Sequence, residues 1–130
     1  MPLTPAICTS IDYSIAFDPM MRMIRDAGFT AVGIGGRISH VGYETPEGAE
    51  RIRTLLEKLG VSAVSVHAPF PEGDQLCSLV EAKRAESVRL CKTAVDAARV
   101  LDAGNVVVHL ARPLPDPAEQ ERALAKGFES

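Results

Sequence analysis

Two histidines stand at the ends of short apolar runs, where they could carry out chemistry together. His67 closes the run that begins at Val61, and His109 closes the run that begins at Asn105. If the two runs are neighbouring parallel strands, both imidazoles lie close together in one concave mouth, able to hold one metal ion or one oxygen-rich substrate. A lone histidine is more often a hydrogen-bonded structural residue, so it is the pair that indicates a functional site.

Other polar residues also follow these runs. Asp12 and Tyr13 come after the first and could hydrogen-bond a substrate, although roles in a turn or in packing suit them equally well. Arg112 follows the fourth run and could receive a phosphate or a carboxylate. A catalytic metal site usually needs three or more protein groups, and no third ligand beside His67 and His109 stands out. The catalytic residues therefore stay unassigned.

The loop after the second run offers weaker signals. Gly35-Gly36 would let backbone approach a ligand closely, but it lacks the spacing of a phosphate-binding loop and suits a simple bend. His40 lies further along the same loop, where exposure to solvent is expected.

Helices and strands must alternate to position these residues. Asp18-Pro19, Thr45-Pro46 and Asp116-Pro117 each place a capping oxygen before a proline suited to the first position of a helix. Three helices end at glycines that can adopt the left-handed conformation, and a Val-rich run follows each glycine. The glycines are Gly28, Gly60 and Gly104, the longest helix spans about 78–103, and the strands are expected at 6–11, 30–35, 61–67 and 105–109. Four strands alternating with helices predict a parallel sheet with right-handed crossovers.

Alternation within the strands favours a barrel wall over an open sheet. One side carries large apolar residues for contact with helices, and the other carries small or partly polar residues that suit a crowded interior. The large set is Val32, Ile34, Val64, Val66, Val106 and Val108, and the other set is Gly33, Gly35, Ala63, Ser65, Asn105 and Val107. Continuing the same count turns His67 and His109 toward the interior.

The chain length predicts a single partial barrel domain over residues 1–130. A complete barrel uses about 250 residues, whereas this sequence has 130 and reaches only four strand-helix units. The last helix, from Asp116, stops without a C-cap, so the chain is expected to end inside its fourth helix. An uncovered inner face and two free strand edges predict either a homo-oligomer or the remainder of a longer barrel as partner.

Composition argues against several classes of protein. A formal net charge of −3 leaves no basic stripe for nucleic acid, and no apolar run approaches the length that spans a membrane. The N-terminus lacks the features of a signal peptide, so the expected location is cytoplasmic. Three cysteines without a CxxC pair predict reduced thiols.

The order of these motifs resembles the N-terminal half of xylose-isomerase-like barrels. The resemblance rests on Ala27-Gly28-Phe29-Thr30-Ala31-Val32, on Leu59-Gly60-Val61 followed by His67-Ala68-Pro69-Phe70, and on Ala103-Gly104-Asn105-Val106-Val107-Val108-His109. That superfamily includes sugar phosphate isomerases and epimerases as well as the endonuclease IV branch of DNA-repair enzymes. The resemblance implies an α/β fold of the (β/α)8 TIM-barrel type, here a partial barrel of about four units.

The resemblance also implies a divalent metal ion, Mn, Mg, Co or Zn, in the complete barrel. In the isomerase branch His67 would help to form the substrate pocket and His109 could line it, whereas in the nuclease branch both would be zinc ligands. Many relatives carry Val-Glu-Leu or Val-Glu-Ile where this chain has Val32-Gly33-Ile34. The metal-binding carboxylates of the isomerases come from the fifth to eighth strands, so this chain should hold no complete metal site and should not catalyse the reaction alone.

Three functions therefore remain open. The leading hypothesis is a sugar isomerase or epimerase half that acts on a small sugar or sugar phosphate at the barrel mouth. A metal-dependent nuclease half would need several basic side chains near the mouth, and only Arg37 and Arg112 are candidates. The third is a non-catalytic α/β binding or dimerisation module, although a receiver-like domain would need Asp where His67 stands.

Overall fold

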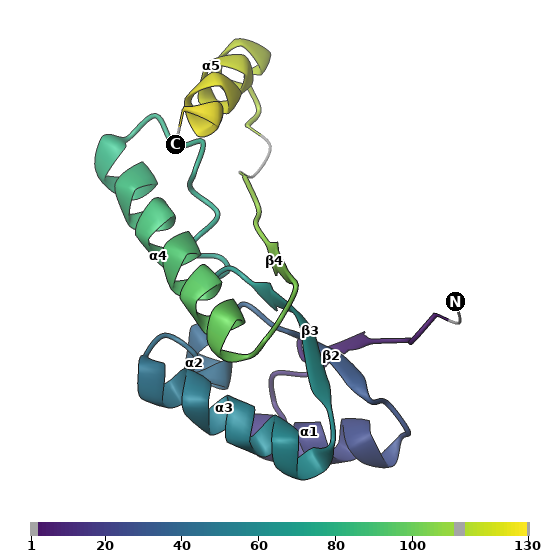
Figure 1. The fold of residues 1–130 in the computed structure, drawn as a ribbon. Coiled ribbons are helices and arrows are strands. Elements are labelled where there is room, and N and C mark those ends of the chain that lie inside the picture. Colours follow the sequence, from purple (N-terminus) through teal and green to yellow (C-terminus); the bar gives the residue numbers. More distant parts are fainter. Residues whose placement is uncertain (1–2, 111–113, 130) are drawn as a thin grey trace.

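Four parallel strands form one sheet in the order β1-β2-β3-β4, and helices join successive strands (Figure 1). The computed structural model describes residues 3–110 and 114–129. The elements are β1 (Ile7–Cys8), α1 (Phe17–Asp26), β2 (Ala31–Ile34), α2 (Ile38–Val41), α3 (Pro46–Leu59), β3 (Ser62–His67), α4 (Glu81–Val100), β4 (Asn105–Val107) and α5 (Pro117–Phe128). The prediction of an α/β fold with four parallel strands is confirmed.

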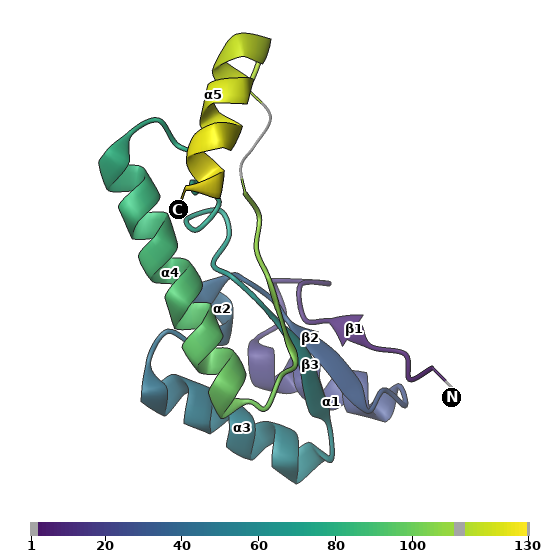
Figure 2. The ribbon, with the colours of Figure 1, turned by 45° about the horizontal axis from the view of Figure 1, so that its top comes forward.

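Helices α1, α3 and α4 lie together along one face of the sheet (Figure 2). Val32 and Ile34 of β2 and Val66 of β3 are fully buried in the core that these helices share. Each such side chain contributes about 1.5–3 kcal/mol when it is removed from water. Gly33 and Ser65 lie on the opposite face, since a Cβ on Gly33 would be 3.0 Å from the Ser65 Oγ. The helices are thus confined to one face, as in a barrel wall.

A register shift in β3 overturns part of the predicted alternation. Val32 pairs with Ala63 and Gly33 pairs with Ser65, so Val64 has no partner between them. This bulge adds one residue to β3 and reverses the alternation before it. Ala63 is therefore buried in the helix-facing core and Val64 is 39% exposed, the reverse of the prediction for both residues.

The predicted helix starts are correct at two of three places. The side chains of Thr45 and Asp116 accept hydrogen bonds from Gly48 N and Ala118 N, as capping residues do. Asp18 is not a cap, because α1 begins two residues earlier, at Phe17, with Ala16 as its N-cap. Asp18 lies within the first turn instead and pairs with Arg51 of α3.

The helix ends show one further difference. Gly28 and Gly60 adopt left-handed φ angles of 93° and 64° after α1 and α3, as expected. After α4 it is Asp102 that adopts the positive φ, at 53°, so Gly104 is not the C-terminal signal of this helix. Aspartate tolerates this conformation better than most residues because its short polar side chain can bond locally.

Helical spacing in the sequence predicts one side of α4 made of Val88, Cys91, Val95 and Ala98, but of these four residues only Ala98 is fully buried. Leu90, Ala94 and Ala97 are buried, whereas Val95 is 37% exposed. Alanine at the contact lets the helix backbone approach the sheet closely, so small residues rather than the valines define the packed side.

Helix α5 lies beyond the carboxyl end of β4 and not alongside it (Figures 1 and 2). Its Ala123 is 1% exposed, and a Cβ on its Gly127 would come within 2.3 Å of the Cys77 Sγ. The helix is therefore packed on the segment that leads from β3 to α4. Among the described residues, no helix is long and apolar enough to cross a membrane.

Candidate functional site

The rings of His67 and His109 lie against each other at the carboxyl ends of β3 and β4. Their centroids are 5.6 Å apart and their planes differ by 27°. His67 is the last residue of β3, but β4 ends at Val107, so His109 follows two residues after its strand. The strand is shorter than predicted because its partner ends there: Val107 is opposite His67, and Ala68 N donates the last hydrogen bond to the Val107 carbonyl. The predicted juxtaposition is confirmed, and the predicted extent of the strand is wrong.

A third ring extends this pair. The centroid of Phe70 lies 5.4 Å from that of His109, and Phe70 is 45% exposed. The backbone N–H of Phe70 donates to the Gly36 carbonyl over 3.0 Å, which joins the end of β3 to the end of β2. His67, His109 and Phe70 form what we call the aromatic wall. Phe70 follows His67 by three residues in the sequence, but only the fold shows that Phe70 contacts His109.

The environment keeps His67 neutral. Partial burial lowers the pKa of His67 below 6.5, and the nearby His109 lowers this pKa further. Its backbone carbonyl accepts a 2.6 Å hydrogen bond from the Tyr43 hydroxyl. Tyr43 is 1% exposed, so a buried side chain fixes the position of the residue. A neutral imidazole offers one donor and one acceptor, which matches the hydrogen-bonding capacity of a hydroxyl group.

A second cluster gathers at the ends of β1 and β2. The guanidinium carbon of Arg37 lies 4.1 Å from the centroid of the Tyr13 ring, and the Tyr13 and His40 rings form a T-shaped pair with centroids 5.2 Å apart. His40 Nε2 lies 2.7 Å from the Ile15 carbonyl, while its buried Nδ1 has no partner among the described residues. The expectation of an exposed His40 in a loop is wrong, because α2 forms there and turns the ring toward Tyr13 and Phe17.

Asp12 is occupied by a local turn. Its Oδ1 accepts hydrogen bonds from the backbone N and the Oγ of Ser14, at 2.8 and 2.7 Å. These bonds, the one from the side chain first, lower the pKa of the Asp12 carboxyl below 3.8. The geometry therefore favours the turn role over substrate binding. Arg112, the remaining candidate, lies outside the described residues.

The described residues do not by themselves fit a divalent metal ion. No three of their His, Cys, Asp and Glu side chains gather into a possible metal site. A metal ion at this mouth would need ligands in addition to His67 and His109.

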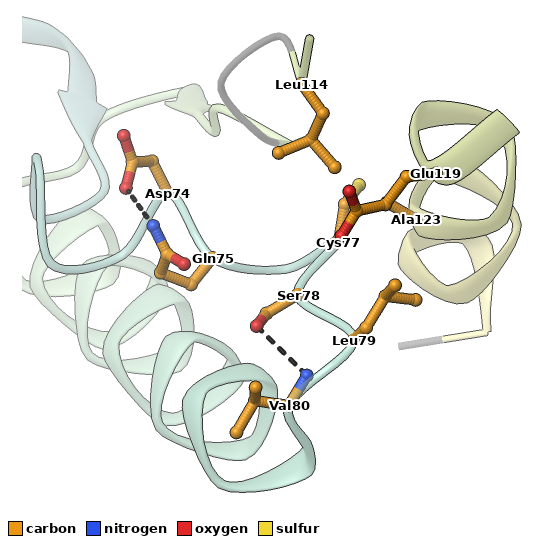
Figure 3. A pocket seen from close by; sticks show the side chains of 9 residues that line it. All are labelled: Asp74, Gln75, Cys77, Ser78, Leu79, Val80, Leu114, Glu119 and Ala123. Atoms are coloured by element: carbon orange, nitrogen blue, oxygen red, sulfur yellow. Dashed lines mark hydrogen bonds between the residues drawn. The ribbon is translucent and has the colours of Figure 1, made fainter. Parts of the chain in front are cut away.

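A pocket that no sequence motif predicts lies between the 74–80 segment and α5 (Figure 3). Its volume is about 200 Å³, and Leu79, Leu114 and Ala123 supply much of its apolar lining. The backbone N–H of Cys77 donates to the carbonyl of Leu110, so the pocket adjoins the segment that carries His109. It exists only because α5 turns back over this segment, which no local motif predicts.

The chain has the architecture of part of a (β/α) barrel. Its strands are parallel, helices cover one face of the sheet, and polar side chains lie at the carboxyl ends of the strands. Residues 21–130 match the family of xylose isomerase-like TIM barrels, and the chain belongs to this family. No curated protein matches the sequence.

Solved structures agree with this fold. The chain is similar to a D-psicose 3-epimerase crystallised in the presence of D-fructose, with a TM-score of 0.73 and 16% identity over 98% of this chain and 45% of that one. It is similar to a 3-keto-D-glucoside 4-epimerase from E. coli, with a TM-score of 0.73 and 13% identity over 98% and 50% of the two chains. It is also similar to a family 2 AP endonuclease from Brucella melitensis, with a TM-score of 0.61 and 19% identity over 98% of this chain and 48% of that one. The chain thus spans about half the length of these structures.

Proposed function

We propose that this chain forms the N-terminal half of a sugar isomerase or epimerase barrel, in which the aromatic wall binds the sugar. The observation that carries the proposal is the contact between His67 and His109 at the carboxyl ends of adjacent strands. Sites of barrels of this type lie at that end. The two structural neighbours with the higher TM-scores are named as epimerases of sugars, which supports this choice of substrate class.

The aromatic wall has the chemistry to recognise a sugar. The imidazoles can donate to and accept from hydroxyl groups, and the face of Phe70 can cover the apolar C–H side of a sugar ring. The wall binds and orients the ligand. The groups that move protons would come from the other half of the barrel, supplied by a longer chain or by a second chain.

Nuclear magnetic resonance of the histidine rings tests the proposal. The sequence has three histidines, and His40 serves as an internal control because its Nε2 is bonded to the Ile15 carbonyl. During titration with D-fructose to about 100 mM, enough to detect millimolar binding of about −4 kcal/mol, the ring resonances of His67 and His109 should shift and saturate. The resonances of His40 should stay in place.

Two further titrations separate the alternatives. If neither His67 nor His109 shows a saturable shift with the sugar, the proposal is wrong. A saturable shift with zinc ions and with a DNA duplex that contains an abasic site, in the absence of any sugar response, would favour the nuclease alternative instead.

A further inference from the structure

The backbone of Arg37 lies next to the loop that carries two residues of the aromatic wall. Arg37 follows Gly36, whose carbonyl accepts the hydrogen bond from Phe70 N over 3.0 Å. A Cβ on Gly36 would come within 2.3 Å of the Ala68 carbonyl oxygen, so the two strand ends are in close contact. The backbone of Arg37 is therefore one residue away from the loop that carries His67 and Phe70.

The guanidinium of Arg37 is held in place by a ring and not by an acid. Its Cζ stands 4.1 Å from the Tyr13 centroid, which is well inside the range of a cation–π contact. Tyr13 is braced in turn by His40, whose ring is fixed by its hydrogen bond to the Ile15 carbonyl. This arrangement orders the guanidinium while its N–H donors stay available.

Several arginines among the described residues have carboxylate partners. Arg51, Arg53 and Arg89 pair with Asp18, with Glu50 and Glu57, and with Glu86, respectively. Within residues 3–110 and 114–129, no carboxylate forms an ion pair with Arg37, although its side chain is exposed at the mouth. An ordered, unneutralised guanidinium, whose backbone adjoins the loop of His67 and Phe70, is suited to an anion, because its planar fork of donors matches a phosphate or a carboxylate.

We propose that Arg37 forms an anion subsite that receives the phosphate or carboxylate group of a sugar bound on the aromatic wall. This inference rests on the proposed function, because the subsite selects among sugars only if His67 and His109 hold the rest of the molecule. It names the substrate class as sugar phosphates or sugar acids in preference to neutral sugars. Tyr13 is a positioning residue that holds the guanidinium.

Competing ligands and charge-matched variants test the subsite. D-fructose 6-phosphate, D-gluconate and D-fructose are titrated against the wild-type chain, and their dissociation constants are read from the ring resonances of His67 and His109. The wild type should bind one of the two anions at least about tenfold more tightly than D-fructose, as expected for a charge-assisted hydrogen-bonded contact. Preference for the phosphate or for the acid identifies which anion the subsite takes.

Substitution of Arg37 should remove this preference selectively. Arg37→Met should bind the anionic and the neutral sugar equally, with unchanged affinity for D-fructose, and Arg37→Lys should keep part of the preference. Arg22→Met is the matched control, because Arg22 is an exposed arginine on α1 and its loss changes the net charge equally. Tyr13→Leu should weaken the preference several-fold, while Tyr13→Phe should retain it because the ring is still present.

The inference and the proposed function fail in different ways. If Arg37→Met keeps the preference for the anion, or if Arg22→Met loses it to the same extent, the subsite is wrong. Saturable shifts of His67 and His109 with D-fructose would still support the sugar-binding wall in that case. If no sugar shifts either ring, the proposed function itself fails.

Discussion

Replacement of Tyr43 by phenylalanine removes one hydroxyl that holds the end of β3. The hydroxyl donates to the His67 carbonyl over 2.6 Å, from a side chain that is 1% exposed. A hydrogen bond of this kind contributes about 1 kcal/mol net, and a carbonyl left without a partner costs about 1–3 kcal/mol when water is excluded. Because His67 is only half-buried, water can reach part of its surroundings. We therefore expect Tyr43→Phe to lower the free energy of unfolding by about 1–2 kcal/mol at pH 7.

The same substitution should have a smaller effect in alkali. Burial raises the pKa of the Tyr43 hydroxyl far above 10.0, and nearby Cys91, Glu44 and Glu72 raise it further. The folded state thus favours the neutral hydroxyl, so its contribution to stability is complete below pH 10 and declines as the pH rises above that value. Phenylalanine does not titrate. The stabilities of the wild type and of Tyr43→Phe should therefore converge above pH 10.

Urea denaturation from pH 7 to pH 11 measures both effects. At pH 7 the loss corresponds to a fall in the melting temperature of about 3–10 °C for a domain of this size. Tyr13→Phe is the control, because the hydroxyl of Tyr13 has no hydrogen bond to the described residues and its removal should change stability by less than about 0.5 kcal/mol. The reasoning is refuted if Tyr43→Phe is as stable as the wild type at pH 7, or if the difference stays constant above pH 10.

Two further substitutions probe the mouth. Gly36→Ala should destabilise the fold by more than about 2 kcal/mol, because its Cβ would lie 2.3 Å from the backbone oxygen of Ala68. Gly104→Ala is the control, because a Cβ at Gly104 meets open space and should be tolerated. Equal melting temperatures of the two variants would contradict this expectation. His67 should titrate below pH 6.5, so the stability that depends on its neutral ring is complete above 6.5 and is lost as the pH falls through the lowered pKa. His109→Gln should raise the pKa of His67 while leaving it below 6.5, since burial is the larger cause, and a pKa of His67 that does not change in the ring resonances would exclude the coupling.

The architecture was readable from the sequence because its signals are local. Each helix end at Gly28 and Gly60 needs only the left-handed conformation of one residue, and the valine runs after them need only the preference for strands. The failures come from contacts between elements. The bulge at Val64 depends on pairing with β2, and the exposed position of Val95 depends on how closely α4 approaches the sheet.

The candidate site was predicted in part for the same reason. The proximity of His67 and His109 follows from strand order, which topology rules fix. The contact of Arg37 with Tyr13 joins two loops whose conformations the sequence does not specify, so a search of the sequence alone would take Arg37 for one exposed arginine among several. The pocket beside α5 was missed because it depends on the position of an entire helix.

The polar side chains at the carboxyl ends of the strands limit the chemistry that this partial barrel can support. In the second strand, a Cβ added to Gly33 would lie 3.0 Å from the Ser65 Oγ, so a side chain such as glutamate at this position would require Ser65 to move. Asp12 accepts two hydrogen bonds from Ser14, and its lowered pKa makes it a weak base. Arg37 and the neutral ring of His67 are suited instead to hydrogen bonds with oxygen atoms of a ligand. The described residues thus favour recognition and orientation of an oxygen-rich molecule, and a proton-transfer reaction would require a carboxylate with a higher pKa than that of Asp12 at the same mouth.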